Sequence, residues 1–558
     1  MKLQKALSNI LNFNALISLL LVLFQSNLNV FNYYPTFLKE YGLFIATNLL
    51  VLLIFKLVKN SFKTDIVRNS LFDILSLILY FIFNLNPYII FTYVILRQLV
   101  VLYDSLMKYY GKKSFVRLLS LNPTFVFLMS FLLTILGGTI LLLLPASTVP
   151  GEKTSLLGSI FTSTSATCVT GLVIYDTGTH FTVFGQMVIL SLIQIGGLGI
   201  MTISTAFAIL LGQRMNLQSE QIMQNVTGES HRINMKNLIK NIILTTLVFE
   251  LIGSLFLYKT FSHVFASSNK ALYYSVFHSV SAFCNAGFAL MPDSFSGFYS
   301  SWNINLVISF LIIFGGLGFS VFVDLQRNLI KKFKPQRFSL HTKIVLSTTT
   351  ILIIVGTILY FISEYSNLMQ GFSFKNRFLA SFFQSVTTRT AGFNTIDMAH
   401  LGKASIFISL FLMFIGASPG STGGGIKTTT LAVIALSIKS LFRGNKDVSA
   451  FKRKINDENI RKVMALIALS MIFLGVMIFV LLLIEPFSFQ KILFEAISAF
   501  GTVGLSMGIT AKLSSLGKIC IIILMYLGRV GPLTLIVALS ERSKPADFTY
   551  IEDKISIG

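Results

Sequence analysis

The sequence predicts an all-α integral membrane protein, in which four tandem units with pseudo-four-fold symmetry follow an N-terminal helical bundle. Two observations predict this fold. Hydrophobic residues make up 54% of the 558 residues and charged residues only 12%, whereas roughly one quarter of the residues of a soluble domain are charged. A short stretch, FTSTSATCVTGL at residues 161–172, also returns three more times along the chain. Repetition at a nearly constant spacing indicates that one structural unit has been duplicated.

Composition and charge exclude several classes of protein. The formal net charge is +23, but the basic residues lie in short loops between apolar runs, which is a pattern of membrane topology and not of nucleic-acid binding. The three cysteines, Cys168, Cys284 and Cys520, lack metal-ligand spacing, so we expect no disulfide framework and no zinc site. The six histidines form no catalytic motif. We therefore expect no enzyme and no cofactor bound by this chain.

Residues 1–117 are predicted to form about four transmembrane helices of unknown role. Apolar runs lie near residues 7–29, 41–58, 69–84 and 88–108. A voltage sensor needs an arginine at every third position of its fourth helix, and only Arg97 is present there. The sequence favours a packing domain held by an ion pair between Arg97 and an aspartate, and it gives no sign of a cleavable signal peptide.

From residue 118 onward the chain divides into four similar units, each with a long apolar helix, the repeated stretch and a second long apolar helix. The first helices are predicted near residues 124–145, 237–258, 343–362 and 461–484, and the second near 184–211, 304–325, 404–440 and 516–539. We place the units at 118–212, 213–326, 327–440 and 441–540, and a C-terminal tail at 541–558.

Basic residues predict the orientation. The loops near 56–68, 108–117, 213–240, 326–343 and 438–462, with both chain ends, carry about 30 Lys and Arg against about 10 on the opposite side. By the positive-inside rule these loops and both termini are cytoplasmic. We therefore expect a multi-pass protein of the inner (cytoplasmic) membrane. The basic run at 443–462 fits either attraction to the lipid surface or docking of a cytoplasmic partner.

The other copies of the repeated stretch are FHSVSAFCNAGF at 277–288, FFQSVTTRTAGF at 382–393 and FEAISAFGTVGL at 494–505. In every copy a Phe precedes a Gly by ten residues. A dozen residues are too few to cross a bilayer. Each copy is therefore predicted to be a re-entrant pore helix that enters from outside, since irregular backbone at membrane depth is tolerated where it lines a water-filled cavity.

The repeated glycines indicate an ion filter. Removing the water of a monovalent cation requires oxygen ligands, which rings of backbone carbonyls can supply, and glycine permits the unusual backbone conformation that such a ring needs. We predict that one ion pore is lined by the carbonyls of Val169, Thr170, Gly171, Asn285, Ala286, Gly287, Thr390, Ala391, Gly392, Thr502, Val503 and Gly504. The alternative is that each glycine only lets two helices approach closely, which four equivalent positions disfavour.

On these residues the chain resembles the Trk/Ktr/HKT superfamily of potassium transporters, which has four tandem helix–pore helix–helix (M1–pore helix–M2) units. The resemblance covers roughly residues 122–558, and CVTGL, CNAGF, TRTAGF and GTVGL look like the single-glycine filters of that family. A serine in place of the first filter glycine marks its sodium-selective plant branch, so Gly171 favours K⁺. The C-terminal residues, which end in IG, look more similar to the KtrB type of membrane subunit than to the Trk type.

The resemblance implies potassium uptake by the ion-conducting subunit of a homodimer with one pore per subunit. It implies a cytoplasmic regulatory ring of KtrA or TrkA type that binds ATP/ADP or NAD(H); this chain has no P-loop of its own. It also raises stimulation by Na⁺, for which the sequence indicates no site. A sodium-translocating or Na⁺-coupled member of the superfamily is the alternative. In a different class, a secondary solute carrier would need inverted repeats, whereas these copies all run in one direction.

A second repeated feature lies about 24 to 28 residues after each filter glycine: QIGGLGI at 194–200, IFGGLGF at 313–319, FIGASPGSTGGGIK at 414–427 and YLGRVGPLT at 526–534. The third copy cannot stay helical, because Pro costs ~3 kcal/mol and each Gly ~1 kcal/mol relative to Ala. The resemblance implies that this irregular segment is an intramembrane gate, with Lys427 as an anchor. The expected gate residues are Gly416, Ser418, Pro419, Gly420, Ser421, Thr422, Gly423, Gly424 and Gly425.

Two arginines fall within the predicted membrane region. Arg529 takes the place of Gly197 and Gly316 in the second repeated feature and lies ~17 Å down its helix, where a charge by default marks function. We expect it to oppose the passage of cations, and the alternative is a salt bridge to an acid such as Glu250. Arg389, inside the third filter stretch, is expected to form a structural ion pair behind the filter.

Overall fold

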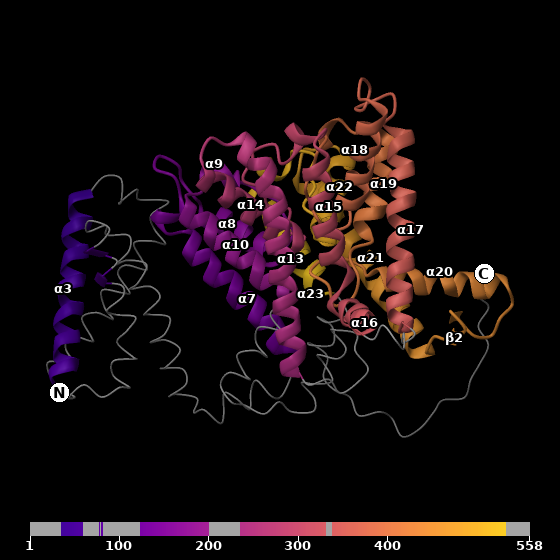
Figure 1. Ribbon diagram of the computed structural model, residues 1–558, viewed down its shortest axis with the longest axis horizontal. Coiled ribbons are helices and arrows are strands. Elements are labelled where there is room, and N and C mark those ends of the chain that lie inside the picture. The colour runs from indigo at the N-terminus through magenta and orange to yellow at the C-terminus, as the bar shows by residue number, and fades with distance from the viewer. Residues whose placement is uncertain are drawn as a thin grey trace.

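The computed structural model describes residues 35–59, 77–78, 80–81, 123–199, 235–330 and 338–531. These residues are mostly helical (Figure 1), as the sequence predicts. Within the predicted N-terminal bundle, α3 (Pro35–Lys59) matches the expected run at 41–58. Most of that bundle, including Arg97, and the C-terminal tail lie outside the described residues.

The helices after residue 122 fall into four consecutive groups. The first contains α7 (Pro123–Leu142), α8 (Leu156–Thr167), α9 (Thr177–His180) and α10 (Val183–Leu198), and the second α13 (Met235–Val264), α14 (Ser268–Phe283), α15 (Trp302–Leu317) and α16 (Phe319–Ile330). The third contains α17 (Leu340–Ser363), α18 (Phe374–Thr387), α19 (Lys403–Phe414) and α20 (Thr428–Phe442), and the fourth α21 (Asp457–Ile484), α22 (Phe489–Gly501) and α23 (Ser515–Val530).

Short elements connect these helices. The 3₁₀ turns are η1 (Pro145–Ser147), η2 (Ser296–Phe298), η3 (Met398–His400) and η4 (Thr510–Lys512). A small antiparallel hairpin of β1 (Ser449–Ala450) and β2 (Arg453–Lys454) follows α20.

Three described helices are long and apolar enough to cross a membrane: Lys240–Val264, Leu340–Ser363 and Asp457–Ile484. The α15–α16 pair adds a fourth if its two parts count as one span. Large apolar side chains point outward from these helices, and Leu255 and Leu483 are 70% and 72% exposed. Such outer faces suit a lipid environment, where apolar side chains need no cover from water.

The four short helices α8, α14, α18 and α22 carry the repeated stretch, and three of them contact the preceding long helix in the same way. The hydroxyls of Ser163, Ser279 and Ser385 donate to the carbonyls of Ile135, Glu250 and Ile353 over 2.6–2.9 Å. Each serine lies against a glycine of that long helix, namely Gly138, Gly253 and Gly356, where a Cβ would collide with the hydroxyl. The repeat in sequence is therefore also a repeat in packing.

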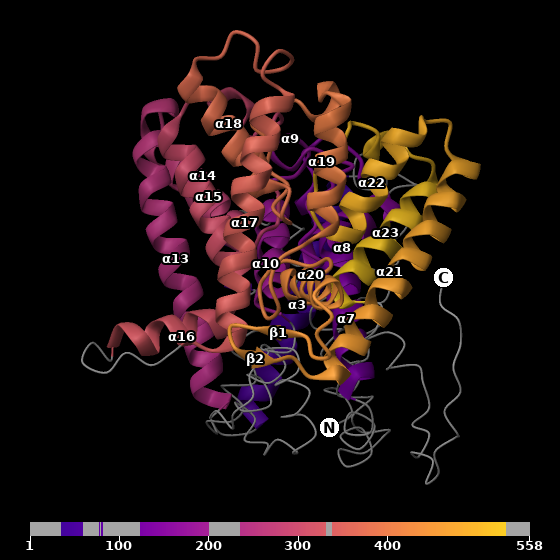
Figure 2. The ribbon, with the colours of Figure 1, turned by 90° about the vertical axis from the view of Figure 1, so that its right-hand side faces the viewer.

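One predicted helix is not straight. The second helix expected near 304–325 ends at Leu317, and α16 turns away from α15 by 95°. The bend lies at Gly318, whose φ of +94° suits glycine and whose missing Cβ leaves room for the carbonyl of Pro419. The break expected in the third group is present between α19 and α20. In both views α16 and α20 lie on opposite sides of α17, and neither runs parallel to it (Figures 1 and 2).

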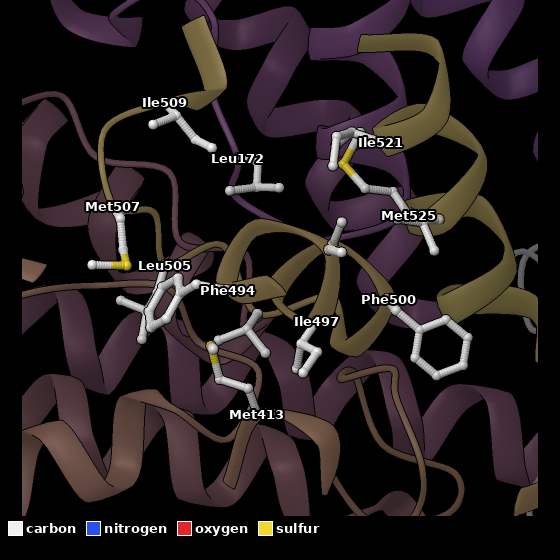
Figure 3. Packing of buried hydrophobic residues seen from close by; sticks show 14 of the residues in the cluster. Leu172, Met413, Phe494, Ile497, Phe500, Leu505, Met507, Ile509, Ile521 and Met525 are labelled. Carbon is white, nitrogen blue, oxygen red and sulfur yellow. The ribbon is translucent and has the colours of Figure 1, made fainter. Parts of the chain in front are cut away.

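The largest buried cluster surrounds α22 and α23 (Figure 3). Phe494, Ile497 and Phe500 of α22 pack there with Ile521 and Met525 of α23. Leu172 from the first group and Met413 from the third complete the same cluster. The packing therefore joins three groups that are distant in the sequence, and interiors packed to this extent resist displacement.

Candidate functional site: a ring of glycines beside an irregular loop

The four repeated glycines face one another in cyclic order. A Cβ built on Gly171 would lie 2.5 Å from the carbonyl oxygen of Ala286, and one on Gly287 would lie 2.8 Å from that of Ala391. The missing Cβ of Gly392 faces the carbonyl of Val503, and that of Gly504 faces the carbonyl of Thr170. Each glycine thus adjoins the backbone of the next group, and the fourth returns to the first.

The backbone has the same unusual conformation in all four groups. The glycines have φ of +91°, +71°, +77° and +93° in chain order. Two residues earlier, Val169, Asn285, Thr390 and Thr502 are also left-handed, with φ between +50° and +66°. A left-handed non-glycine residue costs about 1–2 kcal/mol, and such strain persists only where the surroundings impose it.

Hydroxyl groups of the short helices hold this backbone. The amides of Gly171 and Gly504 donate to the hydroxyls of Ser165 and Ser498, each over 3.1 Å. In the other two groups the hydroxyl donates instead: Ser281 to the carbonyl of Phe288 over 2.8 Å, and Thr387 to that of Phe393 over 2.6 Å. Every predicted filter segment is therefore tied to the helix that precedes it.

The third copy has a different register from the one the sequence suggested. Phe161, Phe277 and Phe494 are fully buried, but Phe382 is only partly buried, and Phe383 is the fully buried residue in α18. The structurally equivalent Phe therefore stands nine residues before Gly392 and not ten.

The expected gate segment forms an irregular loop between α19 and α20, and it bonds to the second group. The amides of Ser418 and Thr422 donate to the carbonyls of Gly316 and Gly315 over 3.0 and 3.2 Å. The amide of Phe319 donates back to the carbonyl of Gly420 over 2.9 Å. The bend between α15 and α16 is thus fixed directly to this loop.

The same loop bonds to the fourth group. The amide of Gly424 donates to the hydroxyl of Thr502 over 3.1 Å, and that of Gly425 to the carbonyl of Gly528 over 3.2 Å. Thr502 is a predicted filter residue, and Gly423 adjoins the side chain of Thr390, another one. The loop therefore lies directly against the filter segment.

Lys427 and Arg529 both bind loop carbonyls. The Lys427 ammonium donates to the carbonyl of Gly423 over 2.8 Å. The Arg529 guanidinium donates to the carbonyl of Thr422 and to that of Gly196 in α10. Arg529 therefore links the loop to the first group.

Two sequence-based ion pairs are absent from the described part of the chain. No carboxylate oxygen there lies within 4.0 Å of Arg529, so the salt bridge to Glu250 is not formed. The nearby Glu250 carboxylate instead faces the thiol of Cys284 over 4.0 Å. Arg389 likewise has no described acidic partner, and its Nε makes no hydrogen bond. Arg529 is bound by the backbone carbonyls of Thr422 and Gly196 and not by a carboxylate.

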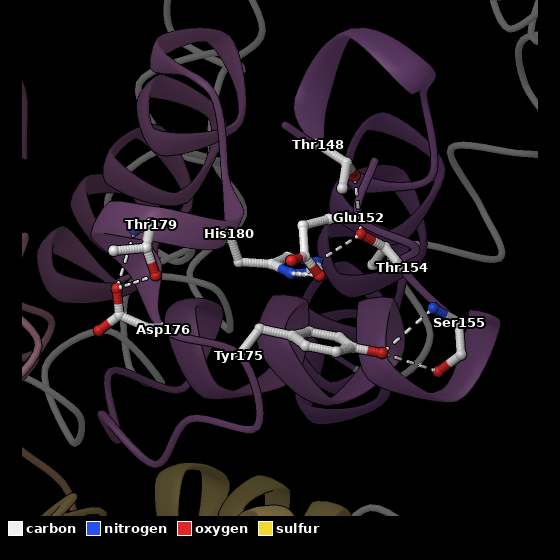
Figure 4. Close-up of polar contacts among 8 residues, drawn as sticks. All are labelled: Thr148, Glu152, Thr154, Ser155, Tyr175, Asp176, Thr179 and His180. Carbon is white, nitrogen blue, oxygen red and sulfur yellow. Dashed lines mark hydrogen bonds and ion pairs between the residues drawn. The ribbon is translucent and has the colours of Figure 1, made fainter. Parts of the chain in front are cut away.

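A polar network that the sequence did not reveal lies in the first group, between the segment that precedes α8 and the segment that contains α9 (Figure 4). The buried His180 ring stacks on Tyr175 at 4.1 Å between centroids, and its Nε2 lies 2.9 Å from the Thr154 hydroxyl. Glu152 lies 3.5 Å from its Nδ1, and the Tyr175 hydroxyl contacts Ser155. Burial lowers the pKa of His180 below its ordinary value.

Within the described ranges, no three His, Cys, Asp or Glu side chains gather closely enough to hold a metal ion. Cys168, Cys284 and Cys520 are free and buried. The polar groups described around the ring and the loop are backbone carbonyls, hydroxyls and the two basic side chains that bind the loop.

Comparison with known proteins identifies the family. The model of the TrkH family, described as cation transport protein, matches residues 120–548. The chain belongs to this family. The TrkH family includes a solved potassium transporter TrkH from Vibrio parahaemolyticus, which superposes with a TM-score of 0.63 at 16% identity and covers 90% of this chain and 98% of its own. That likeness concerns the fold.

Curated TrkH-family relatives are more similar in sequence. Ktr system potassium uptake protein B of Vibrio alginolyticus is 41% identical over 78% of this chain and 94% of its own length. The protein of the same name from Bacillus subtilis is 40% identical over 80% and 99%. Potassium/sodium uptake protein NtpJ of Enterococcus hirae is 36% identical over 78% and 98%. These matches confirm the predicted resemblance to KtrB-type membrane subunits. They also indicate a multi-pass membrane protein.

Proposed function

We propose that this chain is the ion-conducting subunit of a potassium uptake system in the cytoplasmic membrane. The four helix groups are M1–pore helix–M2 units around one pore, and the carbonyls at Val169–Gly171, Asn285–Gly287, Thr390–Gly392 and Thr502–Gly504 select K⁺. The names of the similar proteins from Vibrio alginolyticus and Bacillus subtilis support K⁺ as the substrate.

One observation carries the proposal: the cyclic contact of the four glycines. Each glycine lies against the carbonyl that precedes the next glycine. Four backbone segments of one conformation around a common axis are what a carbonyl filter requires, because several oxygens must replace the hydration shell of the ion at once. If the glycines only allowed helices to pack closely, their contacts would not need to form a closed ring of four.

The loop at Gly416–Gly425 is the gate of this pore. The contacts of Gly423 with Thr390 and of Gly424 with Thr502 support a place for the loop at the inner end of the filter. The hydrogen bonds of the loop reach the second and fourth groups directly, so a shift of those helices would release it. Arg529 and Lys427 hold its carbonyls in the present state.

The subunit works in an assembly with cytoplasmic termini. We propose a homodimer and a regulatory ring that binds the nucleotide, because this chain offers no nucleotide motif. The exposed basic residues Lys446, Lys452 and Arg453 around the β1–β2 hairpin suit a cytoplasmic partner or an anionic membrane surface.

Transport of sodium is the second candidate. The Enterococcus hirae relative is named a potassium/sodium uptake protein. Gly171 favours K⁺ over Na⁺, whereas a coupled movement of Na⁺ would leave the filter unchanged and would appear as a dependence of K⁺ uptake on Na⁺.

The test is uptake of radioactive Rb⁺ into liposomes that contain the purified protein, with and without an excess of K⁺ or Na⁺. We expect competition by K⁺ and only weak competition by Na⁺ in the wild type. Gly171→Ser adds a Cβ against the Ala286 carbonyl and should reduce the preference for K⁺ at least about tenfold, which corresponds to 1.4 kcal/mol. Equal competition by both ions in the wild type, after addition of the regulatory ring, would contradict potassium selection.

A further inference from the structure

Arg389 lies between the pore helix and the filter of the third group. It follows the end of α18 at Thr387 and immediately precedes Thr390, and its amide donates to the carbonyl of Val386 over 3.1 Å. Thr390 contacts Asn285 of the second group and adjoins Gly423 of the loop. Arg389 therefore stands at the level where the filter ends and the gate loop begins.

Arg389 has no charged partner among the residues that the structure describes. The residue is only 7% exposed, no described carboxylate oxygen lies within 4.0 Å of it, and its Nε has no hydrogen-bond partner. A guanidinium stays protonated in proteins. A buried charge without a partner is unfavourable, so this arginine does not serve the structure in the way an ion-paired one would.

The other groups carry uncharged residues at this place. Cys168, Cys284 and Gly501 stand three residues before their glycines, as Arg389 does. In the cyclic order of the glycines, the third group lies opposite the first. Arg529, the other buried arginine beside the loop, instead donates to a carbonyl of the first group.

We propose that Arg389 is a second fixed positive charge at the inner end of the filter, which lowers the occupancy of cations there and limits their passage into the cell. This inference rests on the proposed function. At an effective dielectric constant of about 20, a unit charge roughly 12 Å from a cation changes its occupancy on the order of tenfold. Arg389 acts through its charge and not as an ion ligand.

The test compares Arg389→Gln, which removes the charge, with Arg389→Lys, which keeps it. Initial rates of K⁺-competed Rb⁺ uptake are measured in liposomes with the full chain, at a fixed inside-negative membrane potential. We expect Arg389→Gln to change the rate upward about fivefold to tenfold and Arg389→Lys to remain within about twofold of the wild type. Arg377→Gln is the matched control, because Arg377 lies at the other end of the same helix, where it stacks on Tyr365.

Each outcome separates charge from structure. Equal rates for the wild type and Arg389→Gln would overturn the proposal, as would an Arg389→Lys variant as altered as the Gln variant. If the Gln variant does not fold, Arg389→Cys replaces it, since cysteine is native at this place in two other groups. Failure of both neutral variants beside a folded Lys variant would show a structural charge and also overturn the proposal. Absence of K⁺-competed uptake in the wild type, also after addition of the regulatory ring, would instead reject the proposed function together with this inference.

Discussion

The proposed filter segments and the proposed gate loop both depend on glycine, yet they are held in different ways. Each filter segment is bonded to its own short helix, as Gly171 is to Ser165 and Gly504 to Ser498. The loop has bonds within its own group, as from Lys427 to Gly423, and further bonds to other groups, through Gly315, Gly316, Thr502 and Gly528. If the loop is the gate that we propose, a shift of the other groups would break this second set and leave the bonds of the filter segments to their own helices.

The hydrogen bonds that hold the loop to other groups contribute only a modest free energy. A buried hydrogen bond contributes a net ~0.5–1.5 kcal/mol, so the few bonds between the loop and other groups amount to only several kcal/mol. A regulatory partner can supply a free energy of that size on binding. The proposed filter is additionally packed at all four glycines, where each glycine lies against the backbone of the next group.

The largest expected effect is at the filter. Gly392→Ala combines a left-handed φ of +77° with a Cβ that would collide with the Val503 carbonyl. The conformation alone costs about 1–2 kcal/mol, and the collision adds to it, so uptake of Rb⁺ should fall at least about tenfold. Measured K⁺-competed uptake and the yield of folded protein check this.

Gly371→Ala is the matched control for that variant. Gly371 has a φ of +91° but no atom within 4 Å of a built Cβ. It should lose about 1–2 kcal/mol of stability from the conformation and keep its uptake. If both variants lost uptake equally, strain and not closure of the ring would be the cause.

A smaller effect is expected at the gate. Lys427→Met removes the bond from the ammonium to the carbonyl of Gly423 while it keeps the apolar length of the side chain. Loss of about 1 kcal/mol from the closed loop should raise Rb⁺ uptake about threefold to fivefold in the absence of a regulatory partner. Lys439→Met, at the exposed end of the same α20, should leave uptake unchanged. A Lys427→Met rate equal to that of Lys439→Met would mean that this bond does not hold the gate.

The sequence predicted the ring and the irregular loop because both depend on local chemistry. The cadence that ends at Gly171, Gly287, Gly392 and Gly504 is visible without any structure, and a Pro among glycines at 416–425 excludes a regular helix. The assignment of ligands and of a gate to these residues stays a proposal, although the residues lie together as expected.

What the sequence could not predict depends on residues far apart in the chain. The bend at Gly318 exists because Pro419 and Gly420, a hundred residues later, pack against it. The partners of Arg529 are carbonyls of Thr422 and Gly196, and backbone acceptors have no sequence signature. The one-residue shift to Phe383 was hidden because two adjacent phenylalanines satisfy the same pattern.

The smallest expected effect is a dependence of stability on pH. It concerns His180 in the first group, whereas the loop at 416–427 contains no histidine. His180 is buried, and burial lowers its pKa below the ordinary value of 6.5. Below about pH 6.5 the unfolded chain takes up a proton that the folded one does not, so the free energy of unfolding falls as pH falls. If His180 is protonated in the folded protein, the ion pair with Glu152 adds little stability, because the Glu152 side chain is 60% exposed.

Thermal unfolding of the purified protein at pH values from about 7.5 to about 5.5 tests this dependence. His180→Gln should flatten the decline in Tm toward acid pH, because the glutamine keeps a polar contact to Thr154 without taking up a proton. His400→Gln is the control, since His400 is 74% exposed beside Asp397 and its replacement should leave the decline as in the wild type. Identical curves for the wild type and His180→Gln would show that another group causes the fall in Tm at acid pH. Protonation of His180 would then contribute nothing to it.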